Sequence, residues 1–249
     1  MRGWLTALAA AALLAAGTAK TAAAQVRGAG VPILMYHRVD GLVPRDAVGR
    51  SLTLEPAKFE ASLAWLRQHG LHTLTTVELV EALKRSEHPA SAVVLSFDDG
   101  YEDAFTTVLP LLKRYGARAS FYVSADLIGT PRHLTWRELR AMRDEGMEIG
   151  CHGSRHLDLT VISRTQKRYE IGHCAAALAR YVGVPRTYAY AAGRYDAAAM
   201  EIVRASGFEA ALTERAGTVT SVSDPLELPR RRVDRDSSIA AFAELVSGK

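Results

Sequence analysis

Two adjacent carboxylates follow an apolar run that is typical of a buried strand. The run Ala92-Val93-Val94-Leu95 leads directly into Ser96-Phe97-Asp98-Asp99-Gly100. Neighbouring carboxylates repel each other, and each raises the other's pKa unless a cation lies between them or one stays protonated. We therefore expect a metal ion at the end of this strand.

Two histidines follow a second apolar run. Met147-Glu148-Ile149-Gly150-Cys151 continues into His152-Gly153-Ser154-Arg155-His156. One carboxylate with two imidazoles suits zinc or a similar divalent ion, and the other carboxylate is then free for acid/base chemistry. Taken alone, Asp-Asp-Gly is often a turn with helix-capping acids, and a histidine pair is often exposed surface. Together, at two strand ends, they favour metal-assisted hydrolysis.

The segments around these residues alternate between strand-like and helix-like patterns. Strands are expected at 31–36, up to 96, 119–123, up to 152, 188–192, 209–213 and 228–233, and helices at 59–70, 77–83, 108–116, 136–145, 164–181, 197–206 and 239–246. Such alternation indicates βαβ units, and therefore an α/β protein with a parallel sheet or barrel. The longest loops are expected at 40–50 and 214–226, and no second domain is indicated.

The polar residues that could do chemistry lie at one end of this layout. His37, the pair Asp98 and Asp99, and His152 lie at or just after the ends of predicted strands, and Arg194-Tyr195-Asp196 closely follow another. The carboxyl ends of parallel strands form the active site in α/β folds. We therefore expect one site that combines these side chains.

The first 24 residues have the pattern of a secretory signal peptide. Arg2 precedes an apolar stretch from Trp4 to Ala16, and Ala22-Ala23-Ala24 offers a small-residue cleavage site. The stretch is too short and too alanine-rich for a typical membrane span, although a retained N-terminal anchor is the alternative. We expect a signal peptide at 1–24, one domain at 25–249, and a secreted or periplasmic monomer without a stable membrane anchor.

Composition and charge indicate an ordinary globular protein and do not suggest one that binds nucleic acid. The chain has 249 residues, of which 48% are hydrophobic and 23% charged, as in ordinary globular proteins. Loss of residues 1–24 removes two basic residues and no acid, so the net charge falls from +4 to +2. This small charge does not suggest binding to nucleic acid, and the basic cluster at 230–232 is interpreted as a solvated face.

The two cysteines leave three interpretations open. Cys174 lies on an apolar helical stripe, which favours burial. Cys151 could supply a thiolate ligand, but a residue that precedes an inward-facing His152 should point the other way. Export would permit a disulfide between the two cysteines, and the sequence alone does not decide between these possibilities.

At these motifs the chain resembles the polysaccharide deacetylase family, carbohydrate esterase family four, with its NodB-type homology domain. Residues 96–100 resemble the family's TFDDG motif, 152–156 its HxxxH metal motif, 119–123 its ATFFV strand and 188–193 its third motif. The segments 32–37 and 228–230 resemble the branch of bacterial poly-N-acetylglucosamine deacetylases. The resemblance covers nearly all of residues 31–246.

The resemblance implies a distorted (β/α) barrel of about seven parallel strands in a single domain. It also implies one divalent metal ion, most typically zinc, with cobalt, nickel or iron as alternatives. By the same resemblance Asp99, His152 and His156 hold the metal, Asp98 is the general base and His37 the general acid. The implied reaction removes acetyl groups from N-acetylated sugars, or less often from O-acetylated ones.

The remaining candidates are expected to contact the substrate. They are Tyr190, Ala192, Arg194, Tyr195 and Arg230. The family's third motif usually carries a proline, where this chain has Ala191 and Ala192. No fourth motif of the form Asp-x-x-Trp follows residue 196, so the arginine that normally orients the base is unassigned, and Arg230 is the candidate for it.

The expected partner is an acetylated polysaccharide or oligosaccharide. Two other functions stay open, namely an esterase that removes O-acetyl groups from xylan or a related glycan, and a catalytically silent glycan-binding barrel. The sequence does not identify the polymer, since peptidoglycan, chitin-like oligomers and exopolysaccharide all fit.

Overall fold

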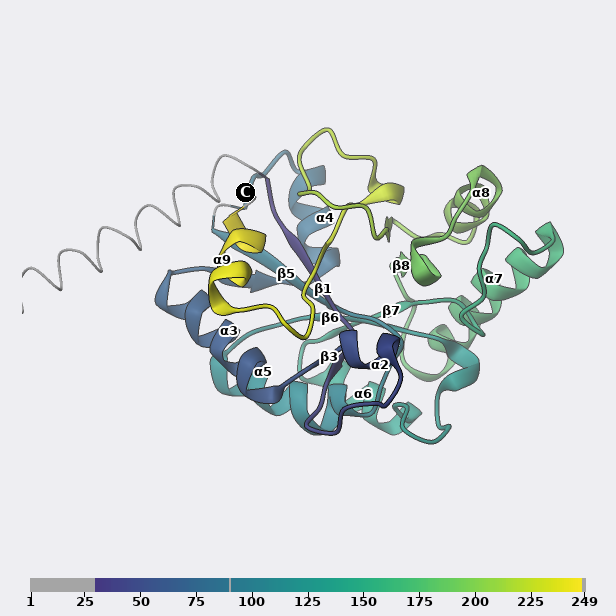
Figure 1. Cartoon of the computed structure of the whole chain (residues 1–249). Coiled ribbons are helices and arrows are strands. Elements are labelled where there is room, and N and C mark those ends of the chain that lie inside the picture. Colours follow the sequence, from purple (N-terminus) through teal and green to yellow (C-terminus); the bar gives the residue numbers. More distant parts are fainter. Residues whose placement is uncertain (1–29, 90, 248–249) are drawn as a thin grey trace, which may run out of the picture.

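A curled, parallel β-sheet forms the centre of the protein (Figure 1). The computed structural model describes residues 30–89 and 91–247. Along the sheet the strand order is β10-β1-β5-β6-β7-β8-β9, and β4 also pairs with β5. The strands are β1 (Ile33–Tyr36), β4 (His72–Leu74), β5 (Ala92–Phe97), β6 (Ser120–Val123), β7 (Glu148–Cys151), β8 (Thr187–Ala189), β9 (Ala210–Leu212) and β10 (Arg231–Arg232). A separate parallel pair joins β2 (Arg38–Val39) to β3 (Thr53–Leu54).

The segment that leads into β10 links the two ends of the sheet. Leu212 of β9 forms a parallel bridge with Leu228, and the Thr213 N–H donates to the Leu228 carbonyl at 2.9 Å. A few residues later Arg231 pairs with Leu34 of β1. The predicted fold, a distorted (β/α) barrel in a single domain, is therefore confirmed.

Helices surround this sheet, as Figure 1 shows. They are α2 (Ala47–Ser51), α3 (Pro56–Gln68), α4 (Thr76–Lys84), α5 (Leu109–Tyr115), α6 (Trp136–Asp144), α7 (Arg164–Tyr181), α8 (Ala197–Ala205) and α9 (Ile239–Ser247). Capping boxes at Thr75, Thr135 and Ser163 satisfy free N–H groups and fix the start of α4, α6 and α7. A π-helical turn, η1 (Ala104–Val108), precedes Pro110, which has no N–H with which to continue the α-helical ladder.

The alternation of side chains along each strand decides which residues face the barrel interior. In β5, Val93, Leu95 and Phe97 pack in the cluster that also holds the helix side chains. Val94 packs in a second cluster, with Ile33 of β1. Because side chains alternate with a period of two, Asp98 follows Val94 on the inner face.

The predicted elements agree closely with the structure. The seven predicted strands are those on the main path of the sheet. Helix α2 lies largely in the predicted loop 40–50, and the short strands β2, β3 and β4 lie where no element is predicted. The predicted signal peptide at 1–24 lies outside the described residues. Within 30–89 and 91–247, no helix combines the length and apolarity that a membrane crossing needs.

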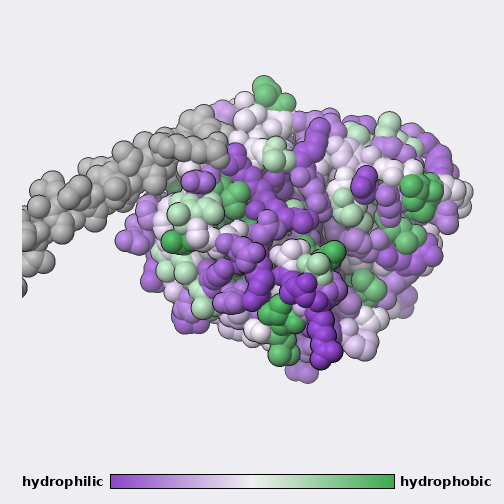
Figure 2. Space-filling view, in the orientation of Figure 1, coloured by the Kyte–Doolittle hydropathy of each residue, from purple (hydrophilic) through white to green (hydrophobic). Residues whose placement is uncertain are grey.

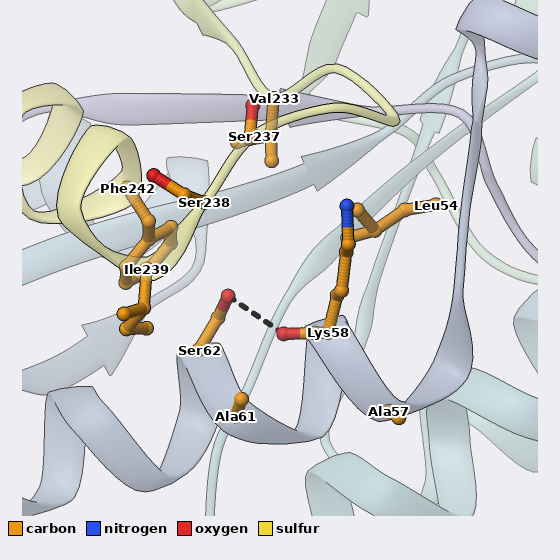
Figure 3. A pocket seen from close by; sticks show the side chains of 10 residues that line it. All are labelled: Leu54, Ala57, Lys58, Ala61, Ser62, Val233, Ser237, Ser238, Ile239 and Phe242. Carbon is orange, nitrogen blue, oxygen red and sulfur yellow. Dashed lines mark hydrogen bonds between the residues drawn. The ribbon is translucent and has the colours of Figure 1, made fainter.

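The surface carries no large apolar face in the view of Figure 2, where hydrophobic residues are scattered among polar ones. A cavity of about 270 Å³ lies between α3 and α9. Figure 3 shows its lining: Leu54, Ala57, Lys58, Ala61, Ser62, Val233, Ser237, Ser238, Ile239 and Phe242. None of the residues with predicted chemistry lines it.

Candidate metal and catalytic site

Strand register brings the predicted residues to one level at the carboxyl end of the barrel. Tyr36 pairs with Phe97, and the Asp98 N–H donates to the Tyr36 carbonyl at 3.0 Å. The His152 N–H donates in the same way to Val123, the last residue of β6, at 2.9 Å. Side chains that directly follow β1, β5 and β7 therefore meet, as expected for parallel strands.

Asp99, His152 and His156 form a compact ligand triad. Their ligand atoms all lie within 4.8 Å of one another. Asp99 Oδ1 is 3.5 Å from His152 Nε2 and 3.3 Å from His156 Nε2. This oxygen is buried and has no hydrogen-bond partner in the described part of the chain. An unpartnered buried carboxylate oxygen is costly, so the arrangement fits a bound cation.

The backbone at two members of the ligand triad is left-handed. Asp99 has a φ of 71° and His156 a φ of 58°. Residues other than glycine in this region store about 1–3 kcal/mol each, and such strain gathers at functional sites. The strained turns aim both side chains at the same point.

His152 is oriented by a contact on its other ring nitrogen. Nδ1 lies 2.7 Å from the Ala189 carbonyl oxygen, which can only accept, so Nδ1 carries the proton and Nε2 faces the Asp99 carboxylate. Burial lowers the pKa of His152, but the nearby carboxylates of Asp98 and Asp99 outweigh it and leave that pKa raised. The excess negative charge here and the preset Nε2 both fit one divalent ion held by the ligand triad.

Asp98 differs from Asp99 because it is paired with the guanidinium group of an arginine. The Arg230 guanidinium, only 1% exposed, donates to both carboxylate oxygens of Asp98, at 2.8 and 2.7 Å. Burial raises the pKa of Asp98, but Arg230, helped by His152 and His37, lowers it overall. Arg230 Nε also donates to the Thr213 carbonyl at 2.8 Å. Asp98 is thus held ionised and fixed, 4.0 Å from His152 Nε2.

His37 directly follows β1 and lies close enough to Asp98 and Arg230 for their charges to act on it. It is 8% exposed. Burial lowers the pKa of His37, the carboxylates of Asp98 and Asp99 raise it, Arg230 and Arg232 lower it further, and the net shift is downward. The Val39 N–H donates to Asp103 Oδ2 at 2.6 Å, which ties the segment after His37 to the loop after the Asp pair.

The other candidates lie around the turn after β8. The rings of Tyr190 and Tyr195 stack with centroids 4.3 Å apart, and the Tyr195 hydroxyl donates to Glu227 at 2.6 Å. Ala192 is exposed with a left-handed φ of 50°, and Arg194 is exposed. No hydrogen bond within 30–89 and 91–247 joins these four to the ligand triad.

Two buried acids escaped the sequence analysis. Asp103 and Glu170 are both buried and both accept backbone N–H groups next to site residues. A signal exists for Glu170, because it lies on the apolar stripe of α7 beside Ile171 and four residues before Cys174. A charged residue on such a stripe is rare unless it has partners.

A disulfide joins Cys151 and Cys174. Cys151 precedes the inward-facing His152, so alternation directs it outward to α7. Of the three possibilities left open by the sequence, the structure contains the disulfide, and Cys151 is not in the ligand triad.

Comparison with known proteins places these features in a family. The family model described as polysaccharide deacetylase matches residues 85–211. "Putative polysaccharide deacetylase YxkH" of Bacillus subtilis (strain 168) is 29% identical over 218 residues, which cover 87% of this chain and 76% of that protein. A poly-beta-1,6-N-acetyl-D-glucosamine N-deacetylase of Staphylococcus aureus (strain MRSA252) is 22% identical over 79% of this chain and 72% of its own length.

The fold is also found among solved structures. Streptococcus pyogenes deacetylase PplD, solved in complex with acetate, superposes with a TM-score of 0.81 at 27% identity, over 87% of this chain and 97% of that one. IcaB from Ammonifex degensii has the same fold, with a TM-score of 0.78 at 24% identity over 89% of this chain and 99% of its own. Since the family match spans about half of the 249 residues and includes the Asp pair and both histidines of the ligand triad, this chain belongs to the polysaccharide deacetylase family.

Proposed function

We propose that this hydrolase removes acetyl groups from the amide nitrogen of N-acetylglucosamine units in a polysaccharide, with one divalent metal ion. The observation that carries the proposal is the ligand triad beside a second carboxylate, Asp98, whose charge is held by Arg230. The name of the Staphylococcus aureus relative supports an N-acetylated glycan as the substrate.

The ligand triad would hold the ion, and its nitrogen and oxygen donors suit zinc, with cobalt, nickel or iron as alternatives. Such an ion acts as a Lewis acid that polarises the acetyl carbonyl and acidifies water. Asp99 would serve as a ligand rather than as the base, because its Oδ1 faces both imidazoles and has no hydrogen-bond partner among residues 30–89 and 91–247.

Asp98 is the general base and His37 the general acid. Asp98 takes a proton from the attacking water while the oxygen of that water bonds to the acetyl carbon. Arg230 fixes the Asp98 carboxylate for this proton transfer. His37 then gives a proton to the sugar nitrogen as the carbon–nitrogen bond breaks, which leaves acetate and a free amine. In this account Arg230 positions the base instead of touching the sugar, because its guanidinium is buried.

The substrate contacts are assigned to the turn after β8. Tyr195 is partly exposed and stacks on the buried Tyr190, so it offers a rigid aromatic face to a sugar ring. The exposed Arg194 can donate to sugar hydroxyls. The backbone at Ala192 takes the place of the family's proline-containing turn.

Metal content and acetate release test the proposal together. We expect about one divalent ion per chain, lost in the His152→Ala, His156→Ala double variant. Acetate should be released from N-acetylglucosamine polymers. Release from acetylated xylan alone would indicate the esterase function. A metal-loaded protein that releases no acetate from either class would indicate the silent glycan-binding barrel.

The role of His37 is tested by the leaving group. His37→Ala should slow amide hydrolysis by ~10²–10⁴, the usual contribution of a positioned acid, whereas an acetate ester of a phenol should suffer far less. Because burial lowers the pKa of His37, wild-type activity on amides should decline as pH rises through a midpoint below the usual histidine value, and the variant should lack this decline. Equal damage to both substrates with an unchanged profile would remove His37 from the role of acid.

We further propose that residues 1–24 are a signal peptide and 25–249 a single secreted or periplasmic domain that acts as a monomer. N-terminal sequencing of the exported protein should begin at Gln25. A native N-terminus at Met1 on a membrane-bound protein would contradict this part.

A further inference from the structure

The turn that carries His156 rests on one buried carboxylate. Glu170 of α7 is 0% exposed. Its Oε2 accepts the N–H groups of Ser154 at 3.1 Å and Arg155 at 2.8 Å, and its Oε1 accepts Arg155 Nε at 2.8 Å. The Ser154 hydroxyl donates to the Glu170 carbonyl at 3.2 Å. Four hydrogen bonds therefore join this turn to one residue.

The carbonyl groups of the turn are held from another direction. The Ala125 N–H donates to the Gly153 carbonyl at 3.0 Å, and the Asp126 N–H to the Ser154 carbonyl at 2.9 Å. The N–H donors of Ser154 and Arg155 bond to Glu170. Hydrogen bonds to an ionised acceptor are about twice as strong as neutral ones, so this carboxylate is the main anchor of the donor side.

The backbone of the turn requires such an anchor. Gly153 and His156 have φ values of 83° and 58°. A Cβ atom placed on Gly153 would lie 3.2 Å from Glu170 Oε2, which shows how closely the turn approaches the carboxylate. A strained conformation persists only where its surroundings fix it. Release of the turn would let His156 relax away from Asp99.

Helix α7 itself does not depend on Glu170. The Cys151–Cys174 disulfide fixes α7 to β7 one helical turn further along. Ile171 and Leu178 add fully buried packing on the same face. The helix thus presents Glu170 from a scaffold that is anchored separately, and the side chain's hydrogen bonds go to the turn.

We propose that Glu170 is a positioning residue that places His156 in the ligand triad before any ion binds. This inference rests on the metal site of the proposed function. Loss of an outer partner of a metal ligand typically weakens metal affinity by about 10–100-fold. The same loss is expected when Glu170 is replaced.

The test uses Glu170→Gln in the full chain. Glutamine keeps the size of the side chain but places an amide donor against one of the donors of the turn. The Zn²⁺ dissociation constant, measured by competition with a chromophoric chelator, should rise about 10–100-fold. The visible absorption of the Co²⁺-loaded protein should change as well, because the spectrum reports ligand geometry.

Glu148→Gln is the matched control. Glu148 is also a largely buried glutamate, but it lies at the start of β7, where Ser120 Oγ donates to it at 2.7 Å and the Val77 N–H at 3.0 Å. This variant should leave metal affinity and the Co²⁺ spectrum unchanged. Arg155→Met should cost less affinity than Glu170→Gln, because it removes the guanidinium and leaves both backbone N–H groups in place.

A metal-free measurement separates this inference from the proposed function. The imidazole Hε1 resonance of His156 should shift or broaden in apo Glu170→Gln and stay in place in apo Glu148→Gln. An unchanged resonance or an unchanged dissociation constant would overturn the role of Glu170 whether or not the enzyme is a deacetylase. Equal metal loss in both glutamine variants would mean that Glu170 contributes only to the general stability of the fold and does not position His156. If Glu170→Gln fails to fold, Glu170→Asp, which keeps the charge on a shorter side chain, is measured in the same way with the same expected direction.

Discussion

Removal of Arg230 should expose how strongly the fold depends on one buried ion pair. The replacement Arg230→Met keeps an unbranched apolar side chain and deletes the guanidinium. It leaves Asp98 buried with a full charge and without the two hydrogen bonds at 2.8 and 2.7 Å. It also frees the Thr213 carbonyl, which accepts from Arg230 Nε.

The expected loss in the free energy of unfolding follows from the burial of both partners of the ion pair, Arg230 and Asp98. Arg230 and Asp98 are 1% and 2% exposed, so solvent does not compensate the remaining charge. Removal of one partner of a buried pair costs about 3–5 kcal/mol. Two charge-assisted hydrogen bonds at about 1.5–3 kcal/mol each lead to the same range. An exposed pair such as Arg114 with Glu60, 59% and 36% exposed, contributes about 0.2–1 kcal/mol.

The stability lost in Arg230→Met should become larger as pH rises. In the wild type, Arg230 lowers the folded-state pKa of Asp98, so the pair contributes stability above the unfolded pKa and loses it as pH falls. In the variant, burial is opposed only by His152 and His37, so the folded-state pKa of Asp98 is higher than in the wild type and less stability is gained as pH rises. The gap between the two proteins should therefore be large at pH 8 and shrink towards pH 4.

Urea unfolding measures these losses of stability. The proteins compared are wild type, the single variants Arg230→Met, Asp98→Asn and Arg114→Met, and the double variant Arg230→Met, Asp98→Asn. Asp98→Asn removes the stranded charge, so the double variant should regain about 0.5–3 kcal/mol relative to the sum of the single losses. The reasoning would be refuted if Arg230→Met cost no more than Arg114→Met, or if its cost were the same from pH 4 to pH 8.

Three further predictions follow from the site and its supports. Asp98→Asn should abolish turnover with metal affinity largely intact, whereas Asp99→Asn should weaken both; equal metal loss by equilibrium dialysis would contradict the division of roles. Burial raises the pKa of Glu148 despite its hydrogen bonds, so its contribution to stability is complete below the unfolded-state pKa and is lost as pH rises through the folded-state pKa. The stability advantage of wild type over Glu148→Gln should therefore shrink towards alkaline pH in thermal scans. A gap that widens instead would refute this. Replacement of Cys151 and Cys174 by alanine should cost about 3 kcal/mol, the loop-closure value for a bridge spanning 23 residues, with the same loss for reduced wild type by urea titration.

The division between Asp98 and Asp99 illustrates where sequence reasoning ends. Both residues follow the same apolar run, and local pattern predicts that they lie at a strand end. Only the register of β5 with β1 and the arrival of Arg230 from the end of the chain separate a paired carboxylate from an unpaired one. Arg230 is 132 residues away in sequence, so no local pattern connects it to Asp98, and it is a candidate for orienting the base only through the family resemblance.

The sequence by itself determined the alternation of strands and helices and the inward direction of His152, because these depend on periods of two or 3.6 residues within short segments. The predicted starts of α4, α6 and α7 agree with the structure to within one residue, and each of these helices begins with a capping box, which is a local pattern. The tertiary structure alone decided that Cys151 bonds to Cys174, that Asp103 and Glu170 hold the turns next to the site, and that Arg230 is buried instead of solvated. Each of these outcomes depends on which distant segment closes the barrel or packs on a strand, and burial, which sets the energetic value of a charge, exists only once those segments meet.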